Sequence, residues 1–345
     1  MAKALSTSPD ADVLPKTEVP AAYREALARL NFSAQTLRAL GRIRHGRISV
    51  DFVLTAASLA AVPLLYKTFP HALTFVVSFV LSIRTFNCFA QLVHASDHGG
   101  LFRSPQLNGL AGNIGAYCLG YTRTGHRLAH LNHHLYLNTV NDPDRIWGAP
   151  EQTTRELGWQ WLRDFFLVSA AGRLLQYSQP DSRPFSAAPW KTLSPLFLVR
   201  GALQLWPVMV TQTLILSYYT LVLGPGYYLL LYVLPIVTFY PAQIRLRSTV
   251  EHSFDIGFRP RSPQDYWVVR STRGAWLERF VFSPLAIHYH FEHHLFPAVP
   301  HYNLRKVHQL LVECGFPVPV APSYVGFVLQ KMRAEKIALA SASVV

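Results

Sequence analysis

Histidine is concentrated in three short windows of this chain, and this clustering limits what the chain can fold into more than any other feature. Ten of the fifteen histidines lie in residues 94–98, 126–134 and 288–294, which together span 21 of the 345 residues. Most stand three or four positions from the next, the spacing that places side chains on one face of a helix. Neutral imidazole is the commonest metal ligand in proteins. The windows hold more imidazoles than one ion can bind, so we predict that the fold brings them together around two metal ions.

Charged residues are scarce, which indicates a membrane protein. The chain is 50% hydrophobic and 15% charged, whereas about 25% is usual in soluble domains. A turn signal at Gly224-Pro225-Gly226 separates two of the apolar runs. Four runs are long enough to cross a bilayer as helices, at residues 48–66, 72–93, 203–223 and 227–244.

The basic residues avoid these runs, and their distribution predicts the topology. Of the 32 Lys and Arg residues, 8 lie in residues 1–47, 10 in 94–200 and 12 in 245–345. By the positive-inside rule, both termini and the 94–200 segment face the cytoplasm. A net charge of +13 would suggest nucleic acid for a soluble chain, but here we expect no nucleic-acid partner. All three histidine windows then meet at one face of the membrane.

We therefore predict an all-α integral membrane protein with four transmembrane helices in two hairpins. A cytoplasmic helical cap would hold the histidine-rich dinuclear metal site. Residues 48–330 form one membrane domain in this prediction, and residues 1–20 and 331–345 form a disordered N-terminus and a frayed C-terminus. The segment 21–47 is predicted to be an amphipathic interfacial helix on the membrane surface, with packing against the rest of the protein as the alternative.

The spacing of the histidines does not identify the metal. A site rich in imidazole suits zinc, copper, iron or nickel, and the three cysteines are scattered. Two closed zinc sites with four ligands each would be structural. Nitrogen ligands with coordination positions left open suit iron and oxygen chemistry.

Three motifs resemble the histidine boxes of the membrane fatty acid desaturase family. They are His94-Ala-Ser-Asp-His98, His130-Leu-Asn-His133-His134 with Asn141-Asp-Pro-Asp144 after it, and His290-Phe-Glu-His293-His294. The resemblance covers roughly residues 50–310. It implies two iron ions in a non-haem centre, with O2 as co-substrate, that removes hydrogen from an unactivated acyl chain. The ligands that it implies are His94, His98, His130, His133, His134, His290, His293 and His294, with His252 as a ninth.

Other residues are predicted to stand behind these ligands. His126 and His288 lie outside the minimal boxes, and an alternative is that His288 takes the place of His290. A metal-bound imidazole usually donates its second N–H to a carboxylate or a carbonyl group. The acids beside the ligands are Asp97, Asp142, Asp144, Glu251 and Glu292, although some of them could simply balance the local positive charge.

Arg84 is an exception among the apolar runs. It lies in the middle of the second predicted span, where a charge is costly and must face protein or water. We expect it to pair with a structural partner, with contact to a polar part of the substrate as the alternative.

The predicted function is desaturation of a fatty acyl chain held as a lipid or as a carrier thioester. A hydroxylase, ketolase or oxidative decarboxylase on the same scaffold is the alternative. A zinc-dependent lipid hydrolase needs only about three protein ligands, and a metal carrier would scatter its ligands through the membrane. Both are therefore less favoured.

Electrons for such a reaction must come from another protein. The chain has no His-Pro-Gly-Gly haem motif, no cysteine-rich iron–sulfur spacing and no glycine-rich dinucleotide loop. We expect a separate ferredoxin or cytochrome as the donor. Such carriers are often acidic, which suits a basic cytoplasmic face that also attracts membrane lipids.

Overall fold

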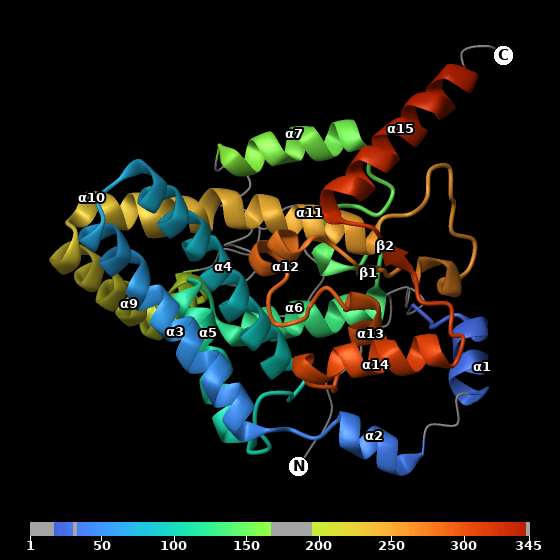
Figure 1. Ribbon diagram of the computed structural model, residues 1–345, viewed down its shortest axis with the longest axis horizontal. Helices are drawn as coiled ribbons and strands as arrows, with labels where there is room; N and C mark the ends of the chain where they lie inside the picture. The colour runs from blue at the N-terminus through green and yellow to red at the C-terminus, as the bar shows by residue number, and fades with distance from the viewer. Residues whose placement is uncertain (1–16, 30–32, 167–194, 343–345) are drawn as a thin grey trace.

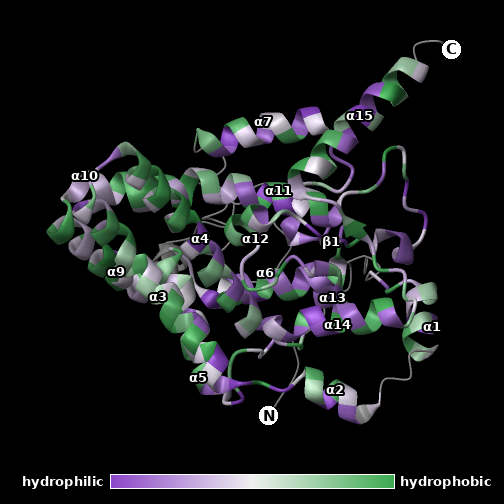
Figure 2. Cartoon of the chain, in the orientation of Figure 1, coloured by the Kyte–Doolittle hydropathy of each residue, from purple (hydrophilic) through white to green (hydrophobic). Residues whose placement is uncertain are grey.

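Long apolar helices and short polar helices occupy opposite ends of the protein. The computed structural model describes residues 17–29, 33–166 and 195–342, and this part of the chain is mostly helical. The long helices gather at one end and the short ones at the other (Figure 1). Hydrophobic residues follow the long helices, and hydrophilic residues are densest among the short ones (Figure 2).

Four helical stretches are long and apolar enough to cross a membrane. They are Gln35–Thr68, Ala72–Asp97, Leu205–Val222 and Pro225–His252. The first three correspond to helices α3 (His45–Thr68), α4 (Ala72–Asp97) and α9 (Pro195–Val222). Each predicted span overlaps one of these stretches, so the prediction of four candidate spans is confirmed.

The fourth stretch is an irregular helix because of its prolines. It consists of α10 (Pro225–Tyr228), the π-helical turns η3 (Leu229–Val233) and η4 (Pro235–Phe239), and α11 (Tyr240–His252). Pro235 and Pro241 have no N–H to donate to the preceding turn, so the regular helical hydrogen bonds are interrupted there. The wider π turns that result line the cavity described below.

The apolar segment after the first histidine window forms helix α5 (Pro105–Cys118), which packs along α4. Glycine makes this contact close: a Cβ at Gly112 would lie 2.1 Å from the Oγ of Ser96. The last carbonyl groups of α5 have no helical partner, and the hydroxyl of Tyr232 donates to the carbonyl of Cys118 at 2.5 Å. Helix α5 is thereby held between the long helices and leads into the second histidine window.

The other end of the protein, together with the last turns of α11, is called the cap below. Its elements are α6 (Arg123–Tyr136), η1 (Pro143–Ile146), α7 (Thr154–Phe165), η5 (Pro263–Tyr266), β1 (Ser271–Thr272), α12 (Trp276–Phe282), α13 (His290–Leu295), α14 (His301–Glu313), β2 (Val320–Ala321) and α15 (Tyr324–Ala342). Strands β1 and β2 pair in parallel, with Ser271 opposite Val320. This two-residue pair is a small departure from the predicted all-α fold.

Residues 21–47 do not form the single helix that was predicted, and the interfacial position of this segment stays a prediction. The segment contains α1 (Ala21–Arg29), α2 (Ala34–Leu40) and the start of α3. The ring of Tyr23 lies 5.4 Å from those of both Trp267 and Phe291, and Leu40 is buried. The apolar face of this segment therefore covers the aromatic core of the cap, as the alternative interpretation required.

The predicted frayed tail, residues 331–345, is also corrected. Helix α15 continues to Ala342, and only residues 343–345 of the tail lie outside the described chain. Lys331 is buried, and the carboxylate of Glu335 accepts the backbone N–H of Thr154 at 3.0 Å. A carboxylate at the first turn of α7 stabilises the free N–H groups there. This contact attaches α15 to α7. Most of the predicted disordered segment, residues 1–16, lies outside the described residues.

Arg84 has an aromatic partner. Its guanidinium carbon lies 4.5 Å from the ring centre of Phe280 in α12. Its Nε is buried and has no hydrogen-bond partner within the described part of the chain. The side chain thus packs as a structural element between α4 and the cap.

Replacing Phe280 with Leu should destabilise the protein by about 1 kcal/mol, because a desolvated cation over an aromatic face contributes about 0.5–2 kcal/mol. Thermal unfolding of the detergent-solubilised protein measures the change, and Phe280→Tyr, which keeps the ring, should behave as wild type. Equal melting temperatures for the Leu variant and wild type would show that the contact contributes nothing.

Candidate metal centre

Four helices direct nine histidines to one place. The first window lies at the end of α4, with His98 as its C-terminal cap, and the second lies on α6. His252 is the last residue of α11, and the third window lies on α13. The structure places them in two groups, namely His94, His98, His130, His134 and His293, and His133, His252, His290 and His294. In each group, one side-chain nitrogen per histidine lies within 4.8 Å of all the others.

Helices α6 and α13 each contribute to both groups. His130 and His134, four residues apart, point to the first group, while His133 points to the second. On α13 the pair His290 and His294 points to the second group, and His293 points to the first. Residues four apart share a helix face, and the residue in between is rotated away from it. The two groups are therefore held at a fixed separation by two short helices.

In each group, several ring nitrogens lie within hydrogen-bond distance of one another at the same time. The Nε2 atoms of His98 and His130 lie 2.7 Å apart, and those of His130 and His134 lie 3.1 Å apart. In the second group the Nε2 atoms of His252 and His290 lie 2.9 Å apart. One N–H can bridge only one such pair, whereas a cation accepts several lone pairs at once. The donor set fits a metal ion in each group.

Burial keeps most of these rings in the form that binds metal. It lowers the pKa of His98 to about 4. Burial also lowers the pKa of five other ligand candidates outside the long helices well below the usual value, namely His130, His134, His290, His293 and His294. Neutral imidazoles with a free lone pair are therefore ready for a cation near neutral pH.

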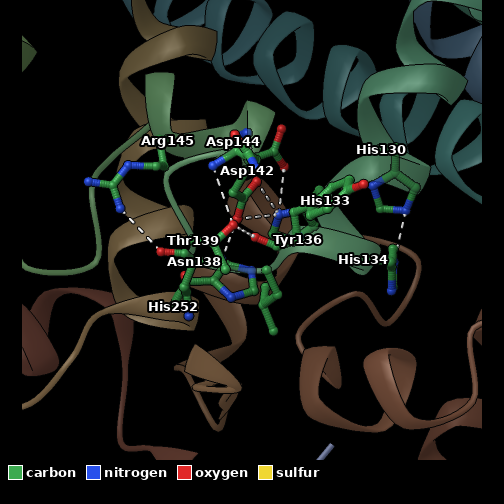
Figure 3. Close-up of polar contacts among 12 residues, drawn as sticks. His130, His133, His134, Tyr136, Asn138, Thr139, Asp142, Asp144, Arg145 and His252 are labelled. Atoms are coloured by element: carbon green, nitrogen blue, oxygen red, sulfur yellow. Dashed lines mark hydrogen bonds and ion pairs between the residues drawn. The ribbon is translucent and has the colours of Figure 1, made fainter. Parts of the chain in front are cut away.

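His133 is held differently, by acids of the loop that follows α6 (Figure 3). Its Nδ1 donates to the carboxylate of Asp142 at 2.9 Å and lies 3.7 Å from that of Asp144. Burial favours the neutral ring, but the charges of these two acids and the hydrogen bond outweigh it and raise the pKa of His133 to about 9. Asp142 also accepts the backbone N–H of Asn138 at 2.7 Å. This arrangement fixes the ring and leaves Nε2 for a metal.

The other predicted acids have different partners. Glu251 pairs with Arg247 at 3.2 Å and lies 3.7 Å from the Nε2 of His290. Asp97 contacts His126 at 2.6 Å rather than one of the nine grouped histidines. Glu292 lies between His290 and His293 in sequence, but its carboxylate has partners other than the grouped histidines. Its two oxygens accept hydrogen bonds from Ser271 and, at 2.5 Å, from the Nδ1 of His308.

His126 and His288 lie outside both groups. His126 borders the cavity, and its ring stacks 5.4 Å from that of Tyr121. His288 contacts the ring of Tyr289 at 4.3 Å, and His290 rather than His288 belongs to the second group.

Sequence reasoning missed Ser271 and His308, which hold α13 from behind. Ser271 also accepts the backbone N–H of Phe291 at 3.1 Å. His308 lies on α14 with no other histidine three or four residues away, since His301 is seven residues before it, so the spacing that marks the three windows does not mark His308.

A cavity of about 570 Å³ connects the histidine groups to the long helices. His94, His133 and His252 line it, and so do Gln212, Tyr228 and Tyr232 of the long helices. Apolar side chains of η3 and η4 also line it. The space suits an apolar molecule with one portion beside the histidines.

The fold and site define a helical protein with candidate membrane spans and two histidine groups that could each hold a metal ion. The family model named fatty acid desaturase matches residues 70–320, and the chain belongs to this family. It is accordingly a fatty acid desaturase-type oxidoreductase. No match was found among curated protein sequences.

Replacing His252 with Ala should remove about one of two metal ions per chain, because it takes one ligand from a group of four and none from the other group. Elemental analysis of purified protein measures this. His288→Ala, a change at a half-buried histidine outside both groups, is the matched control and should retain both ions. Full metal content in the His252 variant would contradict the grouping.

The metal-free protein should lose stability as the pH falls from about 6.5 toward 4. In this range the unfolded histidines take up protons, whereas the folded ones with lowered pKa values, such as His98, do not. His133 contributes in the opposite sense: its stabilisation is complete below about 6.5 and is lost as the pH rises through 9.

Thermal unfolding of the chelator-treated protein across pH 4–9 checks this prediction. His98→Gln should flatten the acid side of the profile, while substitution of the exposed His45 with Gln should leave it unchanged. A melting temperature that stays constant down to pH 4 would contradict the prediction.

Proposed function

We propose that this chain is an integral membrane, O2-dependent desaturase with two iron ions that introduces a double bond into a fatty acyl chain. The observation that carries the proposal is the junction of two imidazole groups, one half-buried and one buried, with a largely apolar cavity in a member of the desaturase family. Imidazole ligation without thiolate suits iron used for oxygen chemistry. Iron in both groups would supply the O2 activation that removal of hydrogen from an unactivated C–H bond requires.

The chain's own residues would perform the positioning in this reaction. The nine grouped histidines would hold the ions, and Asp142 would keep the His133 ring oriented. The apolar side chains of η3, η4 and α11 would bind the acyl chain and exclude water from the site. The substrate would be an acyl lipid or an acyl thioester, with its oxidised carbons beside the border of His94, His133 and His252.

The proposed topology has two hairpins, α3–α4 and α9–α11, with both termini and the cap in the cytoplasm. It is supported by the basic residues that flank the four candidate spans. All four helices that supply the histidines reach the cap, so the metal ions would lie on the cytoplasmic side. A separate ferredoxin or cytochrome would supply the electrons.

Expression of the chain in a host with simple fatty acids should produce a new unsaturated fatty acid, detected by mass spectrometry of methyl esters. The His133→Ala/His134→Ala variant, which takes one ligand candidate from each group, should give none at equal membrane levels. A hydroxylated or oxo product would instead identify a hydroxylase or ketolase. Product formation by the double variant would show that the activity does not need the histidine groups.

A further inference from the structure

We propose that the exposed face of α14, with the basic segment 38–47 beside it, is the docking surface for a small acidic one-electron carrier protein. This inference rests on the proposed function and adds the place at which the reducing partner binds. It follows from the charge of this surface and from the contact between α14 and the ligand helix α13.

The surface is basic over two segments that are distant in sequence. Residues 33–50 contain four arginines and no acidic residue, and Arg38, Arg42, Arg44 and Arg47 are all exposed. On α14, Arg305 and Lys306 are exposed as well. Two bonds bring the segments together: the hydroxyl of Tyr302 accepts the N–H of Arg44 at 2.7 Å, and Asn303 donates to the carbonyl of Leu40 at 2.7 Å.

Little negative charge offsets this surface. The nearest acid of the basic segment, Asp51, is buried and contacts both Arg47 and His301. The acid on α14 is Glu313, at the far end of the helix, about two turns beyond Lys306. Complementary charge speeds encounter and orients weak redox complexes, whose interfaces are small.

This surface also has a short connection to the histidine groups. His308, whose side chain is 28% exposed, donates to the buried carboxylate of Glu292 at 2.5 Å. Glu292 stands between His290 and His293, which belong to different groups. A carrier on α14 would thus sit one side chain away from the helix that serves both metal sites.

A bilayer surface is the other partner that basic residues can fit. Arg44 and Arg47 flank the start of α3 and suit lipid head groups. However, α14 extends from there away from the long helices, beneath α13 (Figure 1). Arg305 and Lys306 are on this helix, so we favour the carrier.

The electron balance requires such a partner. Desaturation of –CH2–CH2– to –CH=CH– releases two electrons and two protons, and reduction of O2 to two waters takes up four of each. Two further electrons therefore come from two molecules of a one-electron carrier, which are oxidised, and two protons come from water.

The test is a binding measurement that does not depend on metal or turnover. The full chain in neutral-lipid nanodiscs is titrated with an oxidised, acidic plant-type [2Fe–2S] ferredoxin at low and high salt. Arg305→Glu/Lys306→Glu should weaken binding about tenfold at low salt, and high salt should abolish most of the difference. Arg333→Glu/Lys336→Glu, which makes the same charge change at exposed positions of α15, should change binding less than about twofold.

A second measurement separates this inference from the proposed function. In the iron-loaded protein, the α14 variant should lose product formation driven by reduced ferredoxin but keep that driven by reduced methyl viologen. If the wild-type protein binds ferredoxin but forms no product with either reductant, the proposed function is rejected and the docking surface is not.

Three results would overturn the docking surface. In the first, the wild-type protein does not bind ferredoxin at low salt. In the second, the α14 and α15 variants weaken binding equally. In the third, the α14 variant binds ferredoxin as wild type does but associates more weakly with anionic phosphatidylglycerol bilayers. The last result would identify the surface as a lipid contact.

Discussion

The convergence of nine imidazoles at the junction of the long helices and the cap is the constraint on which the rest of this structure depends. Burial favours the neutral form of most of the rings, and they approach one another closely enough to share a cation. Burial of so many polar groups is costly without partners. The cap therefore closes around them with carboxylates and helices from both halves of the chain.

Short helices provide the geometry, and the contacts behind them provide the rigidity. Helices α6 and α13 each divide their histidines between the two groups, so small rotations of either helix would disturb both. Asp142 fixes α6 through His133, and Ser271 and His308 fix α13 through Glu292. Of the acids beside the ligands, Asp142 thus holds a ligand ring, and Glu292 holds the helix that carries the ligands.

The same junction explains the irregular fourth span and the path to the surface. Prolines in this span produce π-helical turns at the level of the cavity, where apolar side chains meet the histidine groups. Helix α14, whose exposed face is basic, packs against the ligand helix α13. In the proposed reaction, an acyl chain would enter from the cavity among the long helices and electrons from the basic face of α14.

Local sequence determined the candidate spans and the histidines that gather, because hydropathy and helical spacing act over a few residues. The nine histidines named from the boxes and from His252 are the nine that the structure groups, and whether they bind iron remains a prediction. Only the tertiary structure decided how they divide between two groups, since that depends on how α6 and α13 face each other. It also gave Glu292 its partners, packed α1 against the aromatic core of the cap, and ordered α15. Each of these depends on contacts between residues far apart in the chain, such as Glu292 with His308 of the next helix and Tyr23 with Phe291, which spacing in one segment does not record.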